Sequence, residues 1–216
     1  MKKNVRFLFP VITILLLFWI EQGQNAPYFV KTLAKIGLFL IIPSILFYQT
    51  RFSFLHFRKT DKNSLRVAFV LGFIVMSVII ASFIILHAYI DIDSLLADLG
   101  DAGVTATVFP FVALYILFGN SWLEEFFFRG LLPSFFTHAR FRLFVPSLFF
   151  ALYHVTIFLP WFSPPLLALA IVGLWIGGII FQLVNERSQT ILPSWTIHMF
   201  ADVGVLLVGV YIFYIY

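Results

Sequence analysis

Residues 67–86 read VAFVLGFIVMSVIIASFIIL, an apolar run that contains no charged side chain. A helix needs about 20 apolar residues to cross the ~30 Å hydrocarbon core of a bilayer. The run is apolar on every side of the helix it would form, which is typical of a helix surrounded by lipid. It therefore predicts a membrane-spanning helix, which we place at Val67–Ile90.

The composition of the whole chain agrees with this interpretation. Apolar residues make up 62% of the 216 residues, charged residues make up 11%, and the mean hydropathy is +1.02. A soluble fold of this size needs a polar shell, and the chain has too little polar material to build one. The absence of cysteine excludes disulfides, thiolate nucleophiles and thiolate metal ligands. The net charge of +4 is small, is carried by loops and does not indicate nucleic-acid binding.

Six further apolar segments have the length of a span or come close to it. The seven predicted spans are Val5–Ile20, Tyr28–Tyr48, Val67–Ile90, Val108–Phe128, Leu143–Phe158, Pro165–Val184 and Ile191–Tyr214. The first segment also resembles a signal peptide, but residues 21–25 (EQGQN) offer no cleavage site, so we interpret it as an uncleaved span. A removed signal is the alternative. The sequence thus predicts an all-α polytopic transmembrane bundle in one membrane domain.

The distribution of loop charges predicts the orientation of the bundle. Eleven basic residues fall on one side: Lys2, Lys3, Arg6, Arg51, Arg58, Lys59, Lys62, Arg66, Arg140, Arg142 and Arg187. Only Lys31 and Lys35 fall near the other side, where Glu21, Asp91, Asp93, Asp98 and Asp101 collect. By the positive-inside rule, the N-terminus is cytoplasmic and the C-terminus is outside.

A few ionisable residues remain within or at the edges of the spans. A charge near the centre of a bilayer costs at least ~2.5–3.5 kcal/mol, so such residues face a cavity or one another. One alternative is that they make purely structural contacts between helices. Six of them on three spans argue for a functional site, which depth places in the cytoplasmic half of the bilayer. They are Glu124, Glu125, Arg129, His154, His198 and Asp202.

Helical spacing assigns different surroundings to the two adjacent glutamates. Glu125 and Arg129 stand at positions i and i+4, which favours an ion pair on one face of the helix. Glu124 points about 100° away from that pair and is left free to act as a general base. His198 and Asp202 repeat the i and i+4 spacing, so we expect Asp202 to orient the His198 ring.

Three motifs occur in a fixed order on three spans. They read Glu124-Glu125-Phe126-Phe127-Phe128-Arg129, then Phe150-Ala151-Leu152-Tyr153-His154, then His198-Met199-Phe200-Ala201-Asp202. This order resembles the CPBP family, the CAAX proteases and bacteriocin-processing enzymes formerly called Abi proteins. The resemblance covers roughly residues 108–210. It divides the chain into N-terminal helices with an acidic outer loop (1–107) and a CPBP-like catalytic core of four spans (108–216).

The resemblance implies an intramembrane endopeptidase that forms no covalent acyl-enzyme. Glu124 and His154 would activate a water molecule, and His198 would polarise the scissile carbonyl group or stabilise its oxyanion. In the family, the position that corresponds to Asp202 is Asn in the eukaryotic prenyl endopeptidases and often Asp in bacterial members. An ionised Asp202 would repel an oxyanion, which is why we assign it to His198 instead.

The sequence also leads to expectations about the cofactor and the substrate. We expect that no cofactor is required. Zinc is the alternative, with Glu124, His154 and His198 as the ligands. The expected partners are the lipid bilayer and a protein or peptide in or at the membrane, such as a leader or a C-terminal tail.

Two function classes compete with a protease. A non-catalytic bacteriocin-immunity or scaffold protein would carry the same fold without turnover. A proton-coupled transporter would also place Glu, His and Asp near mid-membrane, but it usually carries repeated halves, and the sequence contains no internal repeat. The signatures of other intramembrane proteases, His-Glu-x-x-His and Gly-x-Ser-x-Gly among them, do not occur in the chain.

The predicted orientation can be tested with reporter fusions. Fusions placed after Lys62, His138 and Arg187 should report a cytoplasmic position, and fusions after Asp98 and Pro160 should report an external one, because the basic residues keep their loops inside. Activity of paired cytoplasmic and exported reporters measures each position. Finding the Lys62 and Asp98 fusions on the same side would contradict the topology.

Overall fold

The computed structural model describes residues 3–24, 26–50 and 52–216, and these are helical apart from one β-bridge between Ile90 and Phe162 and the connecting turns. Lys2 and Arg51, which contribute to the charge asymmetry, lie outside the described residues. Within the described residues, seven helices are long and apolar enough to cross a membrane, as the sequence predicts. They cover Arg6–Gly23, Tyr28–Leu46, Lys62–Tyr89, Phe109–Phe135, Ala139–Phe158, Pro164–Ser188 and Leu192–Tyr214.

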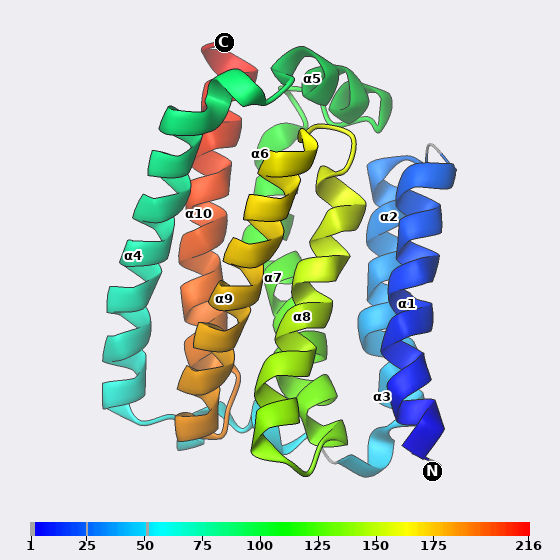
Figure 1. Ribbon diagram of the computed structural model, residues 1–216, viewed down its shortest axis with the longest axis vertical. Coiled ribbons are helices and arrows are strands. Elements are labelled where there is room, and N and C mark those ends of the chain that lie inside the picture. The colour runs from blue at the N-terminus through cyan, green and yellow to red at the C-terminus, as the bar shows by residue number, and fades with distance from the viewer. Residues whose placement is uncertain (1–2, 25, 51) are drawn as a thin grey trace.

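The helices stand side by side with their axes roughly parallel (Figure 1). The first two spans are α1 (Lys3–Gly23) and α2 (Tyr28–Lys35), the latter continued by a π-helical turn and α3 (Ile42–Leu46). They form a hairpin at one side of the bundle. At the opposite side lie α4 (Lys62–Leu86) and α10 (Leu192–Tyr214). The two ends of the chain lie at opposite ends of the bundle, as an odd number of spans requires.

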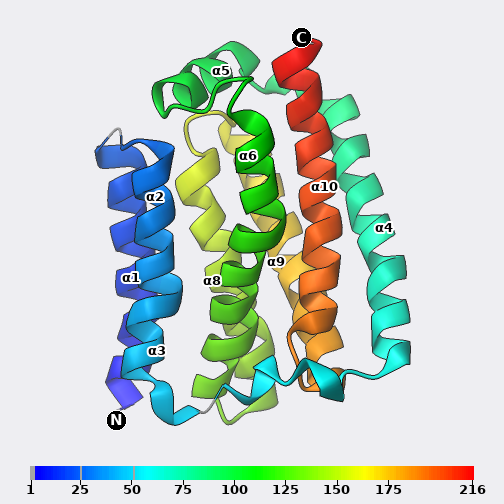
Figure 2. The same ribbon diagram turned by 180° about the vertical axis from the view of Figure 1, so that it is seen from behind.

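The fourth span lies on the far side of α8 (Ala139–Phe158) and α9 (Pro164–Ser188) in Figure 1. Figure 2 shows it in front of them, between the hairpin and α10. It consists of α6 (Phe109–Leu114), α7 (Ser121–Glu124) and the turns that follow each of them. It is the most enclosed of the seven spans, because 39% of the residues in its apolar 18-residue stretch are buried. By contrast, 6% of the residues in the corresponding 18-residue stretch of the α4 span are buried, and Phe73, Val78 and Ile85 are each more than half exposed. Large apolar side chains exposed along a whole helix fit a lipid environment.

Several predicted spans end later or begin earlier than their apolar runs, among them the fourth and the fifth. The fourth span continues past Arg129 to Phe135, because Arg129 is buried and paired rather than placed in a loop. The fifth span begins at Ala139, so Arg140 and Arg142 belong to its first turn. Long basic side chains at a helix end can extend toward the membrane surface, so they do not shorten the helix.

Both ends of the bundle are covered by short segments. Helix α5 (Ile92–Asp101) crosses the end where the C-terminus lies. At the other end, residues 52–59 place Phe52 and Phe54 against Phe126, with ring centroids 5.4 and 5.5 Å apart respectively. The backbone oxygen of Phe54 also accepts a hydrogen bond from the amide of Ile191 at 3.1 Å. This loop therefore closes the bundle beside the segment that carries the paired glutamates.

An aromatic core attaches the N-terminal hairpin to the fourth span. Phe39 stacks on Phe127 with centroids 4.5 Å apart, and it meets the edges of Phe128 and Tyr153 at 5.2 and 5.3 Å. All four rings are 1% exposed or less. Aromatic pairs in such geometries each contribute about 0.5–1.5 kcal/mol beyond the area that they bury. The hairpin is thereby held at a fixed depth beside Glu124.

Candidate functional site

Two π-helical segments flank the paired glutamates. The first covers Tyr115–Asn120 and the second covers Glu125–Leu131, so that Glu124 ends the single α-helical turn between them. Such wide turns are rare and occur mostly at functional positions. Both glutamates point into the bundle, with Glu124 1% exposed and Glu125 fully buried.

Glu125 connects the fourth span to α10. One carboxylate oxygen lies 2.8 Å from Nδ1 of His198, and the other accepts a hydrogen bond from the hydroxyl of Ser194. Arg129 Nη1 lies 3.7 Å from the first oxygen, so the predicted i and i+4 pair is present. Both members of the pair are 1% exposed or less at their side chains. Glu125 is thus committed to three partners.

The guanidinium of Arg129 is held mainly by aromatic faces. It lies 3.7 Å from the centroid of Phe150 on α8 and 5.1 Å from that of Phe181 on α9. None of its nitrogens has a hydrogen-bond partner within the described part of the chain. Cation–π attraction is strongest where water is excluded. Arg129 therefore joins α8 and α9 to the span that carries the glutamates.

His198 is oriented by Glu125 rather than by Asp202, which differs from our expectation. A carboxylate can only accept, so Nδ1 of His198 donates to Glu125 and Nε2 is left facing the interior. Asp202 Oδ1 lies 3.8 Å from Nε2, beyond hydrogen-bond distance. The reason is that Asp202, one turn away on the same helix, approaches the ring from the Nε2 side, whereas Glu125 reaches Nδ1 from the neighbouring span.

His154 presents the same ring nitrogen to the interior. Its Nδ1 lies 2.8 Å from the backbone oxygen of Phe150, which can only accept, so Nδ1 carries the hydrogen. The Phe150 ring meets the His154 ring edge to face at 4.5 Å and also lies 5.9 Å from the His198 ring. Phe150 thus packs against both histidines as well as Arg129, and it leaves their Nε2 atoms free.

Glu124 lies between the two free nitrogens. Its Oε1 accepts a hydrogen bond from Asn120 Nδ2 at 2.8 Å. Its Oε2 lies 3.9 Å from Nε2 of His154 and 3.8 Å from Nε2 of His198. Oε2 is buried and has no hydrogen-bond partner among the described residues. A buried carboxylate oxygen without a partner is costly, and one bridging water would satisfy it together with both nitrogens.

The comparisons with known proteins agree with this geometry. Residues 106–204 match the family model described as type II CAAX prenyl endopeptidase Rce1-like. The chain carries a domain of this family. No curated protein and no solved structure matches the chain significantly. The Rce1-like domain contains all six residues that the motifs single out, and the family implies a protease that acts on a protein substrate.

The donor atoms at the centre of the Rce1-like domain match a zinc site in type but not in spacing. Carboxylate and imidazole donors suit zinc, but tetrahedral bonds of 2.0–2.1 Å place donors only about 3.3 Å apart. Glu124 Oε2 lies 3.8–3.9 Å from the two histidine nitrogens. No group of three or more His, Asp or Glu side chains within the described ranges is arranged to hold a metal. The arrangement as it stands fits a water molecule better than a zinc ion.

Several polar residues of the site were not identified from the sequence. Ser194 and Asn185 form two mutual hydrogen bonds, from Asn185 Nδ2 to Ser194 Oγ at 2.6 Å and from the Ser194 amide to Asn185 Oδ1 at 3.1 Å. Both are at least 96% buried. Asn120 holds Glu124, and Lys35 donates to Asn120. The sequence does carry a signal for Lys35, because it lies inside an apolar run, yet we counted it with the outer loop charges.

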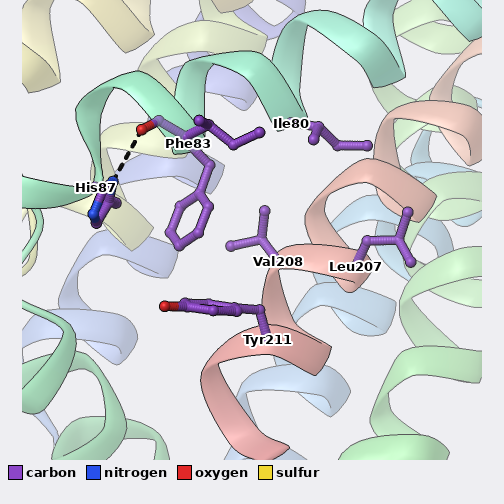
Figure 3. Close-up of a pocket in the computed structure, with 7 residues that line it drawn as sticks. Ile80, Phe83, His87, Leu207, Val208 and Tyr211 are labelled. Atoms are coloured by element: carbon purple, nitrogen blue, oxygen red, sulfur yellow. Dashed lines mark hydrogen bonds between the residues drawn. The ribbon is translucent and has the colours of Figure 1, made fainter. Parts of the chain in front are cut away.

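A groove on the lipid-facing surface lies apart from the Rce1-like site (Figure 3). It has a volume of about 390 Å³ and runs between the C-terminal halves of α4 and α10, where Phe83, Leu207 and Tyr211 line it. His87 stands at one end and bonds to the backbone oxygen of Ile84 at 3.0 Å. None of the six motif residues lines this groove.

The contacts of Glu125 predict a stability effect. Glu125→Gln removes the only anion paired with the buried Arg129 guanidinium in the part of the chain that the structure describes. Breaking such a buried pair costs about 3–5 kcal/mol, so folded yield and melting temperature should fall. Glu124→Gln keeps the pair and should melt near the wild-type temperature. Thermal unfolding of detergent-purified variants measures both, and equal melting temperatures would contradict the distinction.

Proposed function

We propose that this protein is an intramembrane endopeptidase in which Glu124 activates a water molecule to hydrolyse a peptide bond. The observation that carries the proposal is the unpartnered Oε2 of Glu124, which two free imidazole nitrogens border at 3.8 and 3.9 Å in the described part of the chain. A water held there has one strong acceptor and two further polar neighbours. Burial in the bundle removes competing solvent and strengthens each of these interactions.

The proposed reaction has two steps. Glu124 Oε2 takes a proton from the water while the water oxygen attacks the carbon of the scissile carbonyl group, which forms a tetrahedral oxyanion. His154 positions the water through Nε2. In the second step the C–N bond breaks, the carbonyl forms again as a carboxylic acid, and Glu124 returns the proton to the leaving amine.

The oxyanion needs a donor, and we assign that role to His198. In its imidazolium form, His198 donates from Nε2, with Glu125 as the counter-ion at Nδ1 (2.8 Å). Arg129 fixes Glu125 through their 3.7 Å contact. Asp202 borders the same space, and its Oδ2 has no partner within the described ranges, so it can accept from a peptide N–H group of the substrate.

The membrane sets the class of substrate and the orientation. We propose a protein or peptide in or at the bilayer, cleaved within a leader or a C-terminal tail, because the site is enclosed by helices whose outer faces are apolar. We also propose a cytoplasmic N-terminus and a site in the cytoplasmic half of the bilayer, from the eleven-to-two distribution of basic residues.

Substituting the proposed base tests the function without a substrate chosen in advance. Cells that produce the wild type should accumulate new peptide termini that are absent when Glu124→Gln or His154→Ala is produced. Loss of the base should lower turnover by at least ~10²-fold. Mass-spectrometric profiling of termini measures this, with the amount and melting temperature of each variant as controls. If no terminus depends on Glu124, the protein acts as a scaffold or immunity factor and the protease proposal fails.

Chelation tests the proposed absence of a catalytic metal. Because the donor spacing suits water better than zinc, cleavage by the purified protein in detergent should survive strong chelators, and bound zinc should be well below one ion per chain. Elemental analysis and cleavage rates before and after chelation check this. Inactivation that zinc alone reverses would instead make Glu124, His154 and His198 the metal ligands.

A further inference from the structure

A lysine from the N-terminal hairpin reaches the site from outside the Rce1-like domain. Lys35 is the last residue of α2 and lies inside the second span, Tyr28–Leu46, directly before the π-helical turn Ile36–Ile41. Its Nζ donates to Asn120 Oδ1 at 3.0 Å and lies 5.4 Å from the centroid of the Tyr153 ring. A charged residue inside a span is costly to insert and usually has a function.

The contact with Lys35 fixes which way the amide of Asn120 points. An ammonium group has no acceptor, so it can meet only the amide oxygen. The amide nitrogen must then face the opposite way, where it donates to Glu124 Oε1 at 2.8 Å. If the amide turned over, its oxygen would face the carboxylate and its NH₂ group would face the ammonium, and both contacts would be repulsive.

We propose that Lys35 is a positioning residue that selects, through Asn120, which oxygen of Glu124 acts on water. Because Oε1 is bound to Asn120, Oε2 is the oxygen left free between His154 and His198. This inference rests on the proposed function of Glu124. It implies that residues 106–204 do not form a complete site, because the cation comes from the second span.

The aromatic core explains how a separate hairpin can place Lys35 so closely. Phe39, one turn beyond Lys35, stacks on Phe127, and Phe127 belongs to the same π-helical segment as Glu125. Tyr153, which faces the ammonium, packs against Phe39 and Phe128. The depth of Lys35 relative to Glu124 is therefore set by buried rings, not by the exposed surface of the hairpin.

The same helix supplies a matched control. Lys31 lies one turn before Lys35 on α2 and forms an ion pair with Glu21 at 2.9 Å. Both side chains of this pair are about one-fifth exposed, at 18% and 20%. Lys31→Met and Lys35→Met remove the same charge from the same helix, but only the second change breaks the contact with Asn120.

The experiment compares Lys35→Met, Asn120→Leu, their double variant, Lys35→Arg and Lys31→Met in the full chain. The probe is a synthetic quenched peptide that spans a bond whose cleavage depends on Glu124. Lys35→Met should lower kcat by about 10- to 100-fold, because a misplaced base acts poorly, while KM changes by less than about twofold. Lys35→Arg should recover most of the rate, and Lys31→Met should match the wild type.

The double variant decides whether Lys35 acts through Asn120. It should lose no more rate than Asn120→Leu alone, because residues that act as one unit are not additive. The inference would be overturned if the loss of kcat in the double variant equalled the product of the two single losses. A wild-type kcat for Lys35→Met would also overturn it. If the lower melting temperature of Lys35→Met accounts for its whole loss of rate, Lys35 has only a structural role, and the inference is overturned as well.

Failure of this inference can be told apart from failure of the proposed function. If Glu124→Gln abolishes cleavage while Lys35→Met keeps the wild-type kcat, only the positioning role is wrong. If Glu124→Gln still cleaves, the proposed function fails first and the positioning role fails with it. A thermal double-mutant cycle of Lys35 and Asn120 measures their contact without any substrate, and zero coupling would contradict the hydrogen bond itself.

Discussion

The carboxylate of Glu125 is the point on which the arrangement of the bundle depends. It pairs with Arg129 on its own span and bonds to His198 and Ser194 on α10. Through Phe150 and Phe181, the Arg129 guanidinium extends this connection to α8 and α9. In a bilayer no water can satisfy a charge that loses its partner, so the helices must keep the rotation and depth that preserve these contacts.

Because Glu125 makes these contacts, Glu124 is not needed for them. Glu124 and Glu125 have the same chemistry and are adjacent in the chain, but the wide turn that begins at Glu125 directs them to opposite sides of the His198 ring. On one side Nδ1 donates to Glu125, and on the other side Glu124 Oε2 lies 3.8 Å from Nε2. The contacts of Glu125 therefore shape the surroundings of Glu124, whose Oε2 has no hydrogen-bond partner in the described part of the chain.

The N-terminal helices complete this arrangement rather than merely enclosing it. Phe39 fixes the hairpin to the π-helical segment of the fourth span, and Phe54 from the connecting loop packs against Phe126. These contacts hold Lys35 at the level of Asn120 and close the end of the bundle nearest the glutamates. Helices outside the region of family similarity thus contact Asn120, which in turn donates to Glu124.

The sequence alone determined the fold class, the seven spans and the six motif residues, because span length, apolarity and isolated charges are properties of local sequence. It also determined the Glu125–Arg129 pair, since positions i and i+4 share a helix face whatever surrounds them. Only the tertiary structure decided that Glu125, not Asp202, orients His198, and that Lys35 belongs to the site. Those contacts join residues 73 and 85 positions apart, and the depth and rotation of separate helices arise from packing that no local pattern encodes.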